Sequence, residues 1–395
     1  MVLQEITPAI HAGARIKVFG VWGAGCNTVN RMVKEWLDGV DFVAVNTDAQ
    51  VLATSLAPKT INIGLNITKG LGAGANPDTG RKAAEESLET LKAELMDTDM
   101  LFITAGMGGG TGTGAAPVIG QLARQMGILT VGVVTKPFSF EGKRRFEHAL
   151  EGLTKMKESV DTLIVIPNDK IFNIIDKKTT FKQAFSMIDK ILYLGVQGIS
   201  DLIVRPGDIN IDFADIRMIM QGTGTALLGI GYGQGEDRAI DAARRAIDNP
   251  LLEASLEWAK NIIFAVTGGE DLTPIEVQEA ARVVEEIADP DAMIVWGMTF
   301  DESYEGEVKV SIIATGFPEQ LQDNMLKSTN TRTGALSKLG TPSGSRRTGS
   351  SSGGGFIGKA MLDEGVTSAS DAQDEPKEER DYDTPSIIRK KLLNG

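Results

Sequence analysis

Three polar residues near the middle of the chain have side chains suited to phosphate hydrolysis. Asn210, Asp212 and Asp215 bring an amide and two carboxylates into one short segment. Such carboxylates can polarise an attacking water and organise a hydrated cation beside a phosphate. The same residues also suit the solvated end of a strand, and spacing alone favours that simpler interpretation.

A glycine run nearer the amino terminus indicates where a phosphate could bind. Residues 106–114 read Gly-Met-Gly-Gly-Gly-Thr-Gly-Thr-Gly and follow an apolar, strand-like segment, 100–105. We expect a helix to begin near Ala115, with Pro117 in its first turn. Loop N–H groups backed by a helix start form a nest for anions. The run lacks the lysine of a Walker loop, and we interpret it as a nucleotide phosphate cradle rather than a flexible turn.

A second loop also lies between an expected strand and an expected helix. Segment 16–21 leads into Trp22-Gly-Ala-Gly-Cys-Asn27, and Asp48 ends the next strand about twenty residues later, which mimics a weak dinucleotide fingerprint. A Rossmann dehydrogenase is therefore a competing hypothesis. It leaves the glycine run and a further glycine-rich loop at 70–77 unexplained.

The order of the segments predicts the fold class. Apolar β-rich runs alternate with helical segments such as 27–37, which is typical of an α/β protein with a doubly wound parallel sheet. Ligands of such sheets bind beyond the carboxyl ends of the strands, where the glycine loops fall. The first expected strands are 16–21, 42–46, 101–104, 129–134 and 163–166. A second, smaller α/β domain has expected strands at 209–213, 225–232, 262–266, 292–298 and 308–315, with helices near 236–246 and 274–288.

Composition and periodicity divide the chain into six parts. Apolar residues at helical spacing predict a long central helix over 180–204. Residues 330–355 are dominated by Ser, Thr, Gly and basic residues, which cannot bury enough apolar area to fold. The expected parts are a flexible amino terminus (1–14), a nucleotide-binding domain (15–179), the central helix (180–204), a second domain (205–317), a disordered linker (318–380) and a terminal peptide (381–395).

Bulk properties exclude several function classes. The 395 residues carry a net charge of −13, which disfavours nonspecific nucleic-acid binding. One cysteine and two histidines give no support for a disulfide, a zinc site or histidine-based catalysis. No apolar run is long enough to span a bilayer and the start lacks a signal peptide, so we expect a cytoplasmic protein.

Several motifs together resemble one family. The run Gly108-Gly-Gly-Thr-Gly-Thr-Gly114 is similar to the signature of the tubulin/FtsZ superfamily, and its context resembles the bacterial FtsZ branch. The resemblance covers roughly 13–317 and a short terminal peptide, and it includes segments 44–48, 70–77, 137–142, 167–169 and 210–215. It implies a GTPase that assembles into filaments and scaffolds the cytokinetic ring in bacterial cell division.

The resemblance also assigns phosphate contacts. It implies that the diphosphate is held by Gly23, Ala24, Gly25, Cys26 and Asn27 and by Gly108, Gly109, Gly110, Thr111, Gly112 and Thr113. Ala73, Gly74 and Ala75 would place N–H groups near a γ-phosphate. Mg2+ would be held mainly by phosphates and water, with no protein ligand set. Glu141 and Arg145, four residues apart, should face the same way and suit ribose or phosphate contacts, although a surface ion pair fits their spacing equally well.

Guanine selection is implied for two residues of the central helix. Phe185 and Asp189 lie one turn apart, so that a ring could pack on a purine while a carboxylate accepts from its N1–H and N2–H groups. Adenine offers an acceptor there and would leave the charge unpaired. Spacing alone favours a core Phe and a solvated Asp. The resemblance favours the base site and adds Asn168 as a further base contact.

Geometry separates the carboxylates from their own nucleotide. From Asp189 to Val204 the helix would extend roughly 22 Å. If Asp212 and Asp215 are catalytic, they must therefore enter the site of another copy stacked head to tail, an arrangement that repeats into an open filament. GTP hydrolysis would then depend on assembly.

The carboxyl terminus resembles the partner-binding peptide of the family. The segment that the resemblance assigns to division adaptor proteins includes Pro385, Ile387, Ile388, Arg389 and Lys390. Many copies along a filament would gain avidity for such adaptors, and membrane contact would be indirect. The alternative is a frayed tail without partners.

Three residues interrupt a first loop that is usually almost all glycine in the family: Trp22, Ala24 and Cys26. We expect the ring of Trp22 to turn aside from the phosphates, because it would otherwise block them. Cys26 is expected to be an inert small residue. Asp208 adds a negative charge where the family more often has an apolar residue. A nucleotide-dependent scaffold that does not hydrolyse GTP remains the alternative function, ahead of the dehydrogenase.

Overall fold

The computed structural model describes residues 13–37, 39–176, 178–204, 211–249, 252 and 254–327. All of them fall within one structural unit, Met1–Asn330. Asn210, Asp208 and the predicted terminal peptide lie outside the described residues.

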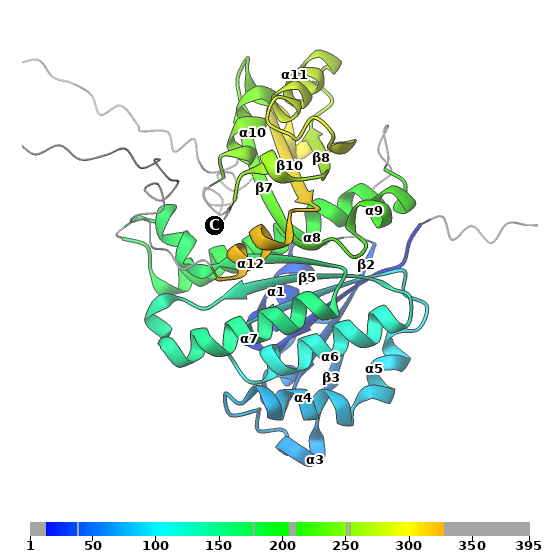
Figure 1. Ribbon diagram of the computed structural model, residues 1–395, viewed down its shortest axis with the longest axis vertical. Helices are drawn as coiled ribbons and strands as arrows, with labels where there is room; N and C mark the ends of the chain where they lie inside the picture. The colour runs from blue at the N-terminus through cyan, green and yellow to red at the C-terminus, as the bar shows by residue number, and fades with distance from the viewer. Residues whose placement is uncertain are drawn as a thin grey trace, which may run out of the picture. The chain divides into compact units, whose positions relative to one another are not determined.

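A ten-stranded sheet runs through this unit in the order β3-β2-β1-β4-β5-β6-β7-β10-β8-β9 (Figure 1). The first six neighbouring pairs in this order are all parallel. The strands of this part are β1 (Ile16–Val21), β2 (Val40–Asn46), β3 (Lys59–Asn62), β4 (Met100–Gly106), β5 (Leu129–Lys136) and β6 (Thr162–Pro167). The doubly wound parallel sheet predicted from the sequence is confirmed.

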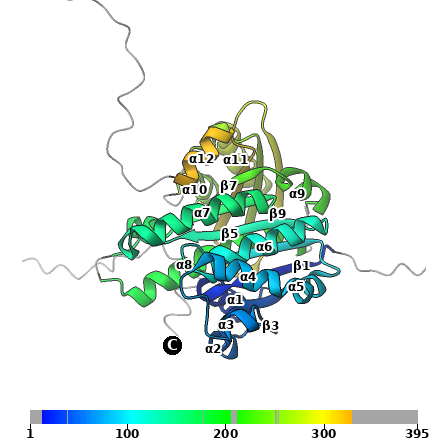
Figure 2. The same cartoon turned by 60° about the horizontal axis from the view of Figure 1, so that its bottom comes forward.

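Helices cover both faces of the parallel sheet (Figure 2). One buried cluster joins strands to α1 (Trp22–Lys34), α8 (Phe181–Val204) and α9 (Phe213–Met220). The other joins them to α4 (Pro77–Glu86), α5 (Leu88–Leu95), α6 (Thr111–Gln125) and α7 (Lys143–Ser159). Short helices α2 (Ala49–Ala53) and α3 (Leu65–Thr68) and the 3-10 turns η1 (Ser139–Glu141) and η2 (Asn168–Asn173) complete this half.

The second half continues the sheet with mixed pairing. β7 (Gly224–Gln234) pairs with β6 over its first three residues and then with β10 (Glu307–Thr315), which is antiparallel to both β7 and β8 (Asn261–Gly268). β9 (Met293–Phe300) is parallel to β8. α10 (Arg238–Ile247) and α11 (Pro274–Glu285) pack on these strands around a separate apolar cluster, with the turns η3 (Leu256–Trp258) and η4 (Glu302–Tyr304).

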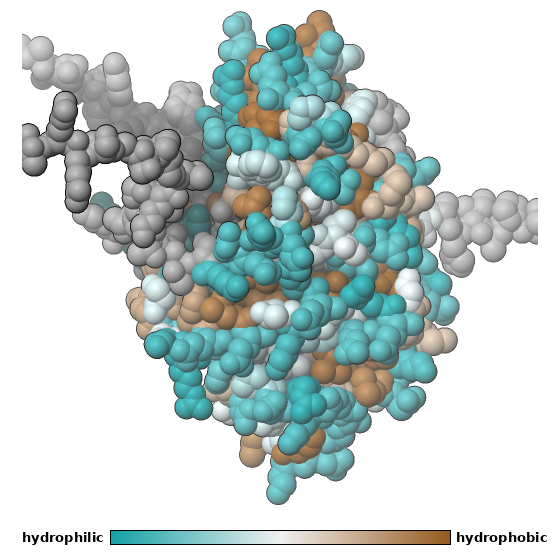
Figure 3. Space-filling view, in the orientation of Figure 1, coloured by the Kyte–Doolittle hydropathy of each residue, from teal (hydrophilic) through white to brown (hydrophobic). Residues whose placement is uncertain are grey.

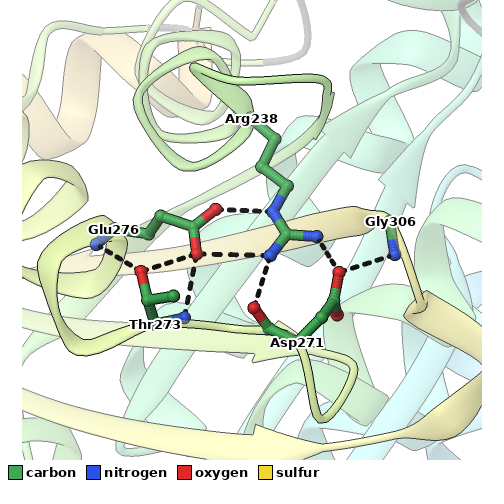
Figure 4. A network of polar contacts seen from close by, with 5 residues as sticks. All are labelled: Arg238, Asp271, Thr273, Glu276 and Gly306. Carbon is green, nitrogen blue, oxygen red and sulfur yellow. Dashed lines mark hydrogen bonds and ion pairs between the residues drawn. The ribbon is translucent and has the colours of Figure 1, made fainter.

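One buried arginine ties together the elements of this second half (Figure 4). Arg238 donates from Nε to Glu276 at 2.6 Å and from a terminal nitrogen to the carbonyl oxygen of Asp271 at 3.0 Å. Glu276 also accepts from the N–H and the hydroxyl of Thr273, each at 2.8 Å. The carboxylate of Asp271 accepts from the N–H of Gly306. The side chains of Thr273 and Glu276 at the start of α11 and the carboxylate of Asp271 are therefore all hydrogen-bonded.

The predicted disordered linker begins too early. Residues 319–327 form helix α12 (Glu319–Lys327), so the boundary at 318 is wrong. The helix buries Gln322, Met325 and Leu326. The amide of Gln322 donates to the carbonyl oxygen of Phe317 at 2.7 Å and its oxygen accepts from the N–H of Thr225 at 3.1 Å. Burial of these side chains offsets the conformational entropy that the segment loses when it becomes ordered. The polar composition of the segment gave no sign of this burial.

Two further expectations about elements are corrected. The predicted strand 209–213 is not formed at its described end, because Asp212 is the N-cap of α9 and Phe213 is its first residue. Helix α6 begins at Thr111 rather than near Ala115, since Gly110 already has helical φ and ψ values. Pro117 consequently lies inside the helix instead of in its first turn.

Hydrophilic side chains dominate much of the face drawn in Figure 3, with smaller apolar areas between them. Among the described residues, we find no helix that is both long and apolar enough to cross a bilayer.

Candidate nucleotide-phosphate site

A cavity of about 1010 Å3 opens where the glycine loops meet. It lies at the carboxyl ends of β1, β2 and β4, because Trp22 follows β1, Asn46 ends β2 and Gly108 follows β4. Doubly wound sheets bind their ligands at this edge. The lining brings together ten of the predicted site residues: Gly23, Ala73, Gly74, Ala75, Gly108, Gly109, Gly110, Thr111, Glu141 and Arg145.

Three helices begin at the wall of this cavity, α1 at Trp22, α4 at Pro77 and α6 at Thr111. The start of α4 is closed by Asn76, whose side chain accepts from the N–H of Asp78. The starts of α1 and α6 have neither a side-chain cap nor an acidic residue in the first turn. Their first N–H groups and the positive ends of their dipoles are therefore available to an anion.

The glycines of 106–114 serve two different purposes. A Cβ added at Gly110, Gly112 or Gly114 would come within 2.8, 2.6 and 2.0 Å of atoms of neighbouring segments, so close packing requires these three. Gly108 has a φ of +97°, a conformation that strains residues with a side chain. Gly110, Gly112 and Gly114 are therefore explained by packing and Gly108 by its backbone conformation. Only the other glycines of the run are left to be explained by close approach of a ligand.

Two threonine hydroxyls fix the shape of the loop. Oγ1 of Thr111 lies 2.6 Å from Oγ1 of Thr47, and the N–H of Gly108 donates to Oγ1 of Thr113 at 2.8 Å. Neither Thr113 nor Gly112 lines the cavity. The hydroxyls of this loop brace the protein, and the contacts open to the cavity come mainly from its backbone.

Glu141 and Arg145 pair across a break in the helix rather than on one helical turn. Glu141 ends η1, Gly142 follows with a φ of +99°, and Arg145 lies in α7. Nε of Arg145 lies 3.0 Å from Oε2 of Glu141, but its N–H is not aligned for donation and makes no hydrogen bond within the described part of the chain. Arg145 thus offers a buried donor beside the cavity.

The expectation that Trp22 turns aside is wrong. Its ring lies against the glycine turn, about 3.3 Å from the position of a Cβ at Gly106 and 3.4 Å from one at Gly109. The guanidinium carbon of Arg145 stands 5.5 Å from the ring centroid. Trp22 has a φ of +65°, and this left-handed backbone aims the side chain at the loop.

The other residues predicted as the first loop belong to the first turns of α1, and Gly25 and Cys26 among them face the protein interior. Sγ of Cys26 is 3.5 Å from the carbonyl oxygen of Gly20, and burial raises the pKa of this thiol to about 12. A Cβ at Gly25 would lie 2.2 Å from the carbonyl oxygen of Thr104. These two residues and Ala24 lie outside the cavity lining, as does the exposed Asn27. The inert character expected for Cys26 fits its burial and raised pKa.

Two of the predicted base-binding residues, Phe185 and Asp189, lie on α8, which contacts α1 through Arg31 and Ser186. The ring of Phe185 contacts Phe138 edge-on at 5.6 Å and remains 47% exposed, which leaves area for a base to stack. Asp189 lies beside Thr28 and Arg31 of α1, where burial raises its pKa to about 6 although both neighbours lower it. Burial thus disfavours the charge that guanine recognition needs, unless donors arrive to stabilise it.

Asn168 begins η2 directly after β6 and is 8% exposed. Its Oδ1 makes no hydrogen bond to any described residue. Asn168, Phe185 and Asp189 are absent from the lining of the phosphate cavity. Helix α1 connects the two places, because its start lies in the cavity and Thr28 lies roughly 9 Å further along its axis.

Sequence reasoning missed a polar stripe on α7. Arg144, His148, Glu151 and Lys155 line the cavity at spacings of four, three and four residues. This is the spacing of one helix face, so the periodicity of the sequence could have revealed it. Asn46 was also missed, and its Nδ2 is buried without a hydrogen-bond partner among the described residues.

The predicted catalytic carboxylates lie at the opposite edge of the sheet. Asp212 and Asp215 flank the start of α9, and Arg217 of that helix donates to the carbonyl oxygens of Gly127 and Asp99. These carbonyls precede β5 and β4, whereas the cavity follows the carboxyl end of β4. Seven residues of β4 therefore separate the two places, roughly 23 Å.

No group of three or more His, Cys, Asp or Glu side chains suited to a metal ion occurs in the described ranges. The helix starts and N–H groups of the cavity suit an anion instead.

The fold and the cavity define an α/β nucleotide-phosphate-binding protein. A model of the Tubulin/FtsZ family GTPase domain matches residues 15–176, and a model of the FtsZ family C-terminal domain matches 224–318. A solved FtsZ dimer of M. jannaschii shares 46% identity over 77% of this chain and 88% of its own, with a TM-score of 0.74. The chain belongs to the tubulin/FtsZ family, and it is a GTPase.

Other solved structures include a tryptophan-to-tyrosine mutant of M. jannaschii FtsZ, with 46% identity, a TM-score of 0.74 and coverage of 77% of this chain and 92% of that one. CetZ2 of Haloferax volcanii, solved as a GTPγS-bound protofilament, shares 21% identity with a TM-score of 0.67 over 79% of this chain and 97% of its own. This more distant similarity concerns the fold alone. The predicted family and GTPase activity are confirmed.

Proposed function

We propose that this GTPase assembles head to tail into filaments and hydrolyses GTP at the contacts between subunits. The two uncapped helix starts carry the nucleotide part of the proposal, because α1 and α6 direct free N–H groups into one cavity. Phosphates on these groups leave the base directed along α1 towards Phe185, Asp189 and Asn168. Mg2+ would neutralise the phosphates and keep waters as its other ligands.

The separation of the carboxylates supports hydrolysis in trans. Asp212 is exposed and Asp215 partly exposed, and neither makes an ion pair with any described residue. Because they lie at the amino ends of β4 and β5, they can reach a nucleotide only in the next subunit, where they polarise the attacking water. Asn210 belongs to the same proposed loop. The solved M. jannaschii FtsZ dimer agrees with self-association.

The cellular role follows from the family. We infer a cytoplasmic filament that forms the scaffold of the cytokinetic ring at the division site. The terminal peptide with Pro385, Ile387, Ile388, Arg389 and Lys390 would bind division adaptors, and the membrane would be reached only through them. The domain limits predicted at 179, 204 and 380 remain part of this proposal.

The test is GTP hydrolysis per subunit as a function of protein concentration, with Mg2+ present. Specific activity should rise steeply above a threshold, and Asp212→Ala should bind GTP while losing most turnover. Asp291→Ala, which changes an exposed carboxylate of the second half, should behave as wild type.

Each alternative has its own outcome. Concentration-independent hydrolysis would contradict catalysis in trans. GTP binding and assembly without turnover would favour the inert scaffold, and binding of NAD(P) but not GTP would favour the dehydrogenase.

A further inference from the structure

Trp22 has a backbone conformation that its side chain does not favour. Its φ of +65° lies in the left-handed region, which glycine adopts freely and residues with a Cβ avoid. Trp22 is also the first residue of α1, directly after the buried strand β1. A strained conformation at the start of an uncapped helix is typical of a functional constraint rather than of stability.

The strained backbone directs the indole into the phosphate cradle. The ring contacts the positions of Cβ atoms at Gly106 and Gly109 at 3.3 and 3.4 Å, and Cβ of Trp22 itself lies 3.6 Å from that of Gly112. These glycines lead into and out of the start of α6. The indole thus lies directly against the turn that leads into the uncapped start of α6.

Arg145 covers the indole from another element. Its guanidinium carbon is 5.5 Å from the ring centroid, close enough for a cation–π contact. The Nε of the same guanidinium is buried and makes no hydrogen bond within the described residues. Arg145 therefore contacts both the ring and the carboxylate of Glu141, whose Oε2 lies 3.0 Å from its Nε, and displacement of the ring would open the guanidinium to a phosphate.

We propose that Trp22 is a gate on the phosphate cradle, which must swing away from Gly109 before the phosphates of GTP can bind and which releases Arg145 to them as it moves. This inference rests on the proposed GTP binding. Phosphates seated on the α6 turn and an indole in contact with the same turn compete for one volume. Binding then proceeds only through the fraction of molecules with the ring displaced, which lowers the association rate and the apparent affinity.

The gate acts on phosphates and not on the base. Phe185 and Asp189 are outside the cavity that Trp22 lines. Guanosine, which carries no phosphate, should therefore bind without displacing the ring. Comparison of guanosine with GTP separates a gate on the cradle from a general loosening of the site.

The experiment measures association of a ribose-labelled fluorescent GTP by stopped flow, in the full-length chain with Mg2+. Trp22→Gly should accelerate association roughly fivefold to tenfold, on the scale of one cation–π contact and its packing, and Trp22→Phe should have a smaller effect. Gly suits the backbone at this position, so the variant should fold. Trp36→Gly is the matched control, because Trp36 also has a positive φ, of +52°, but is 80% exposed beyond the end of α1.

Intrinsic fluorescence supplies a second readout. The chain has four tryptophans, and unlabelled GTP should change the emission of wild type and of Trp36→Gly but not that of Trp22→Gly. Equal association rates in wild type and Trp22→Gly would overturn the gate and leave GTP binding intact. A matching acceleration for labelled guanosine would also overturn it. Failure of every variant to bind GTP would instead contradict the proposed function itself.

Discussion

The start of α11 in the second half is built in the opposite way to the starts of α1 and α6 in the first. At α11, Thr273 and Glu276 form a reciprocal capping box, and Glu276 additionally binds the buried Arg238 (Figure 4). At α1 and α6 no side chain caps the helix, no acidic residue stands in the first turn, and both open on a cavity. At the start of α11, side chains of the protein accept hydrogen bonds from the backbone. At the starts of α1 and α6, no side chain of the described residues accepts from the first N–H groups.

The cavity and the Arg238 network also differ in whether their buried polar side chains have hydrogen-bond partners. Asn46 Nδ2, Arg145 Nε and Asn168 Oδ1 are buried without hydrogen-bond partners among the described residues, and all three belong to the predicted nucleotide site or its cavity. No side-chain atom of the Arg238 network is in that state. Seven buried side-chain atoms of the described residues are in that state, and the other four belong to Asn62, Thr98, Thr104 and Thr225, outside the cavity lining. Since unpaired buried groups destabilise a fold, a bound nucleotide that supplied partners for Asn46, Arg145 and Asn168 would stabilise this site.

Removal of the network's arginine should have the largest effect on stability. Arg238→Met should lower the free energy of unfolding by about 3 kcal/mol, because Glu276 and Asp271 lose their partner. Hydrogen bonds from Arg238 lower the pKa of Glu276 to about 2, so this stabilisation is present above the ordinary carboxyl range and is lost only as pH falls towards 2. Urea unfolding at pH 7 measures the loss.

The exposed pair Arg282 and Glu286 provides the matched control. Arg282→Met should change stability by less than about 0.5 kcal/mol. Equal losses in the two variants would remove the distinction between a saturated network and ordinary surface charge.

At the site, Asp189→Asn should reduce GTP affinity by about a hundredfold or more, because the amide presents a donor to guanine N–H groups. Xanthosine triphosphate, which has an oxygen in place of the 2-amino group, should bind this variant more tightly than it binds the wild-type protein. Calorimetric titration with both nucleotides measures the change. Unaltered preference for GTP would show that Asp189 does not read the base.

The same substitution should stabilise the protein. Burial raises the pKa of Asp189 to about 6, so the folded state binds its proton more tightly than the unfolded state, and stability falls as pH rises from about 4 to 6. Asp189→Asn should therefore add about 1–3 kcal/mol at pH 7 and nothing at pH 4. A loss of stability at pH 7 would contradict this assignment of the cause.

A smaller effect on binding is expected at Arg145. Arg145→Ala should weaken GTP binding roughly tenfold, the contribution of one charged hydrogen bond, and change stability by less than about 0.5 kcal/mol. Lys143→Ala removes a neighbouring charge that is 89% exposed and serves as control. If both variants weaken GTP binding equally, general charge rather than the unpaired Nε explains the effect.

The smallest change concerns the cap of α11. Thr273→Ala should lower the free energy of unfolding by about 1 kcal/mol and leave GTP affinity unaltered. Urea unfolding and nucleotide titration on one preparation measure both quantities. Loss of GTP affinity would show that the two halves are not independent in the way the comparison implies.

Long or strongly apolar elements could be predicted from the sequence. The sequence predicts a strand at 16–21 and a helix at 180–204, and the structure has β1 at Ile16–Val21 and α8 at Phe181–Val204. The short apolar run of β1 favours a buried strand, and the helical spacing of apolar residues in α8 favours a long helix. The strand prediction for segment 209–213 is wrong because the segment alternates apolar and polar residues as a strand does, whereas Asp212 is the N-cap of helix α9. Helix α12 was not predicted, because only three of its residues are buried and the segment around them is polar.

The site was predictable in composition but not in arrangement. The glycine run marked the cavity, yet spacing could not distinguish Gly114, which packs against α4, from Gly108, which needs a positive φ. The orientation of Trp22 depends on one left-handed backbone angle. A sequence motif carries no information on that angle, and the expectation was therefore wrong.

The central claim is that each active site combines two subunits, and complementation tests it most directly. Asp212→Ala keeps the cradle and lacks the carboxylate. Asp189→Asn keeps Asp212 but, with its GTP affinity lowered about a hundredfold, stays largely empty at a GTP concentration that just saturates wild type. Neither variant alone should hydrolyse GTP appreciably. A mixture in equal amounts should recover activity, up to roughly a quarter of the wild-type rate because that fraction of random contacts joins the two intact parts. A mixture as inactive as its components would contradict the shared site.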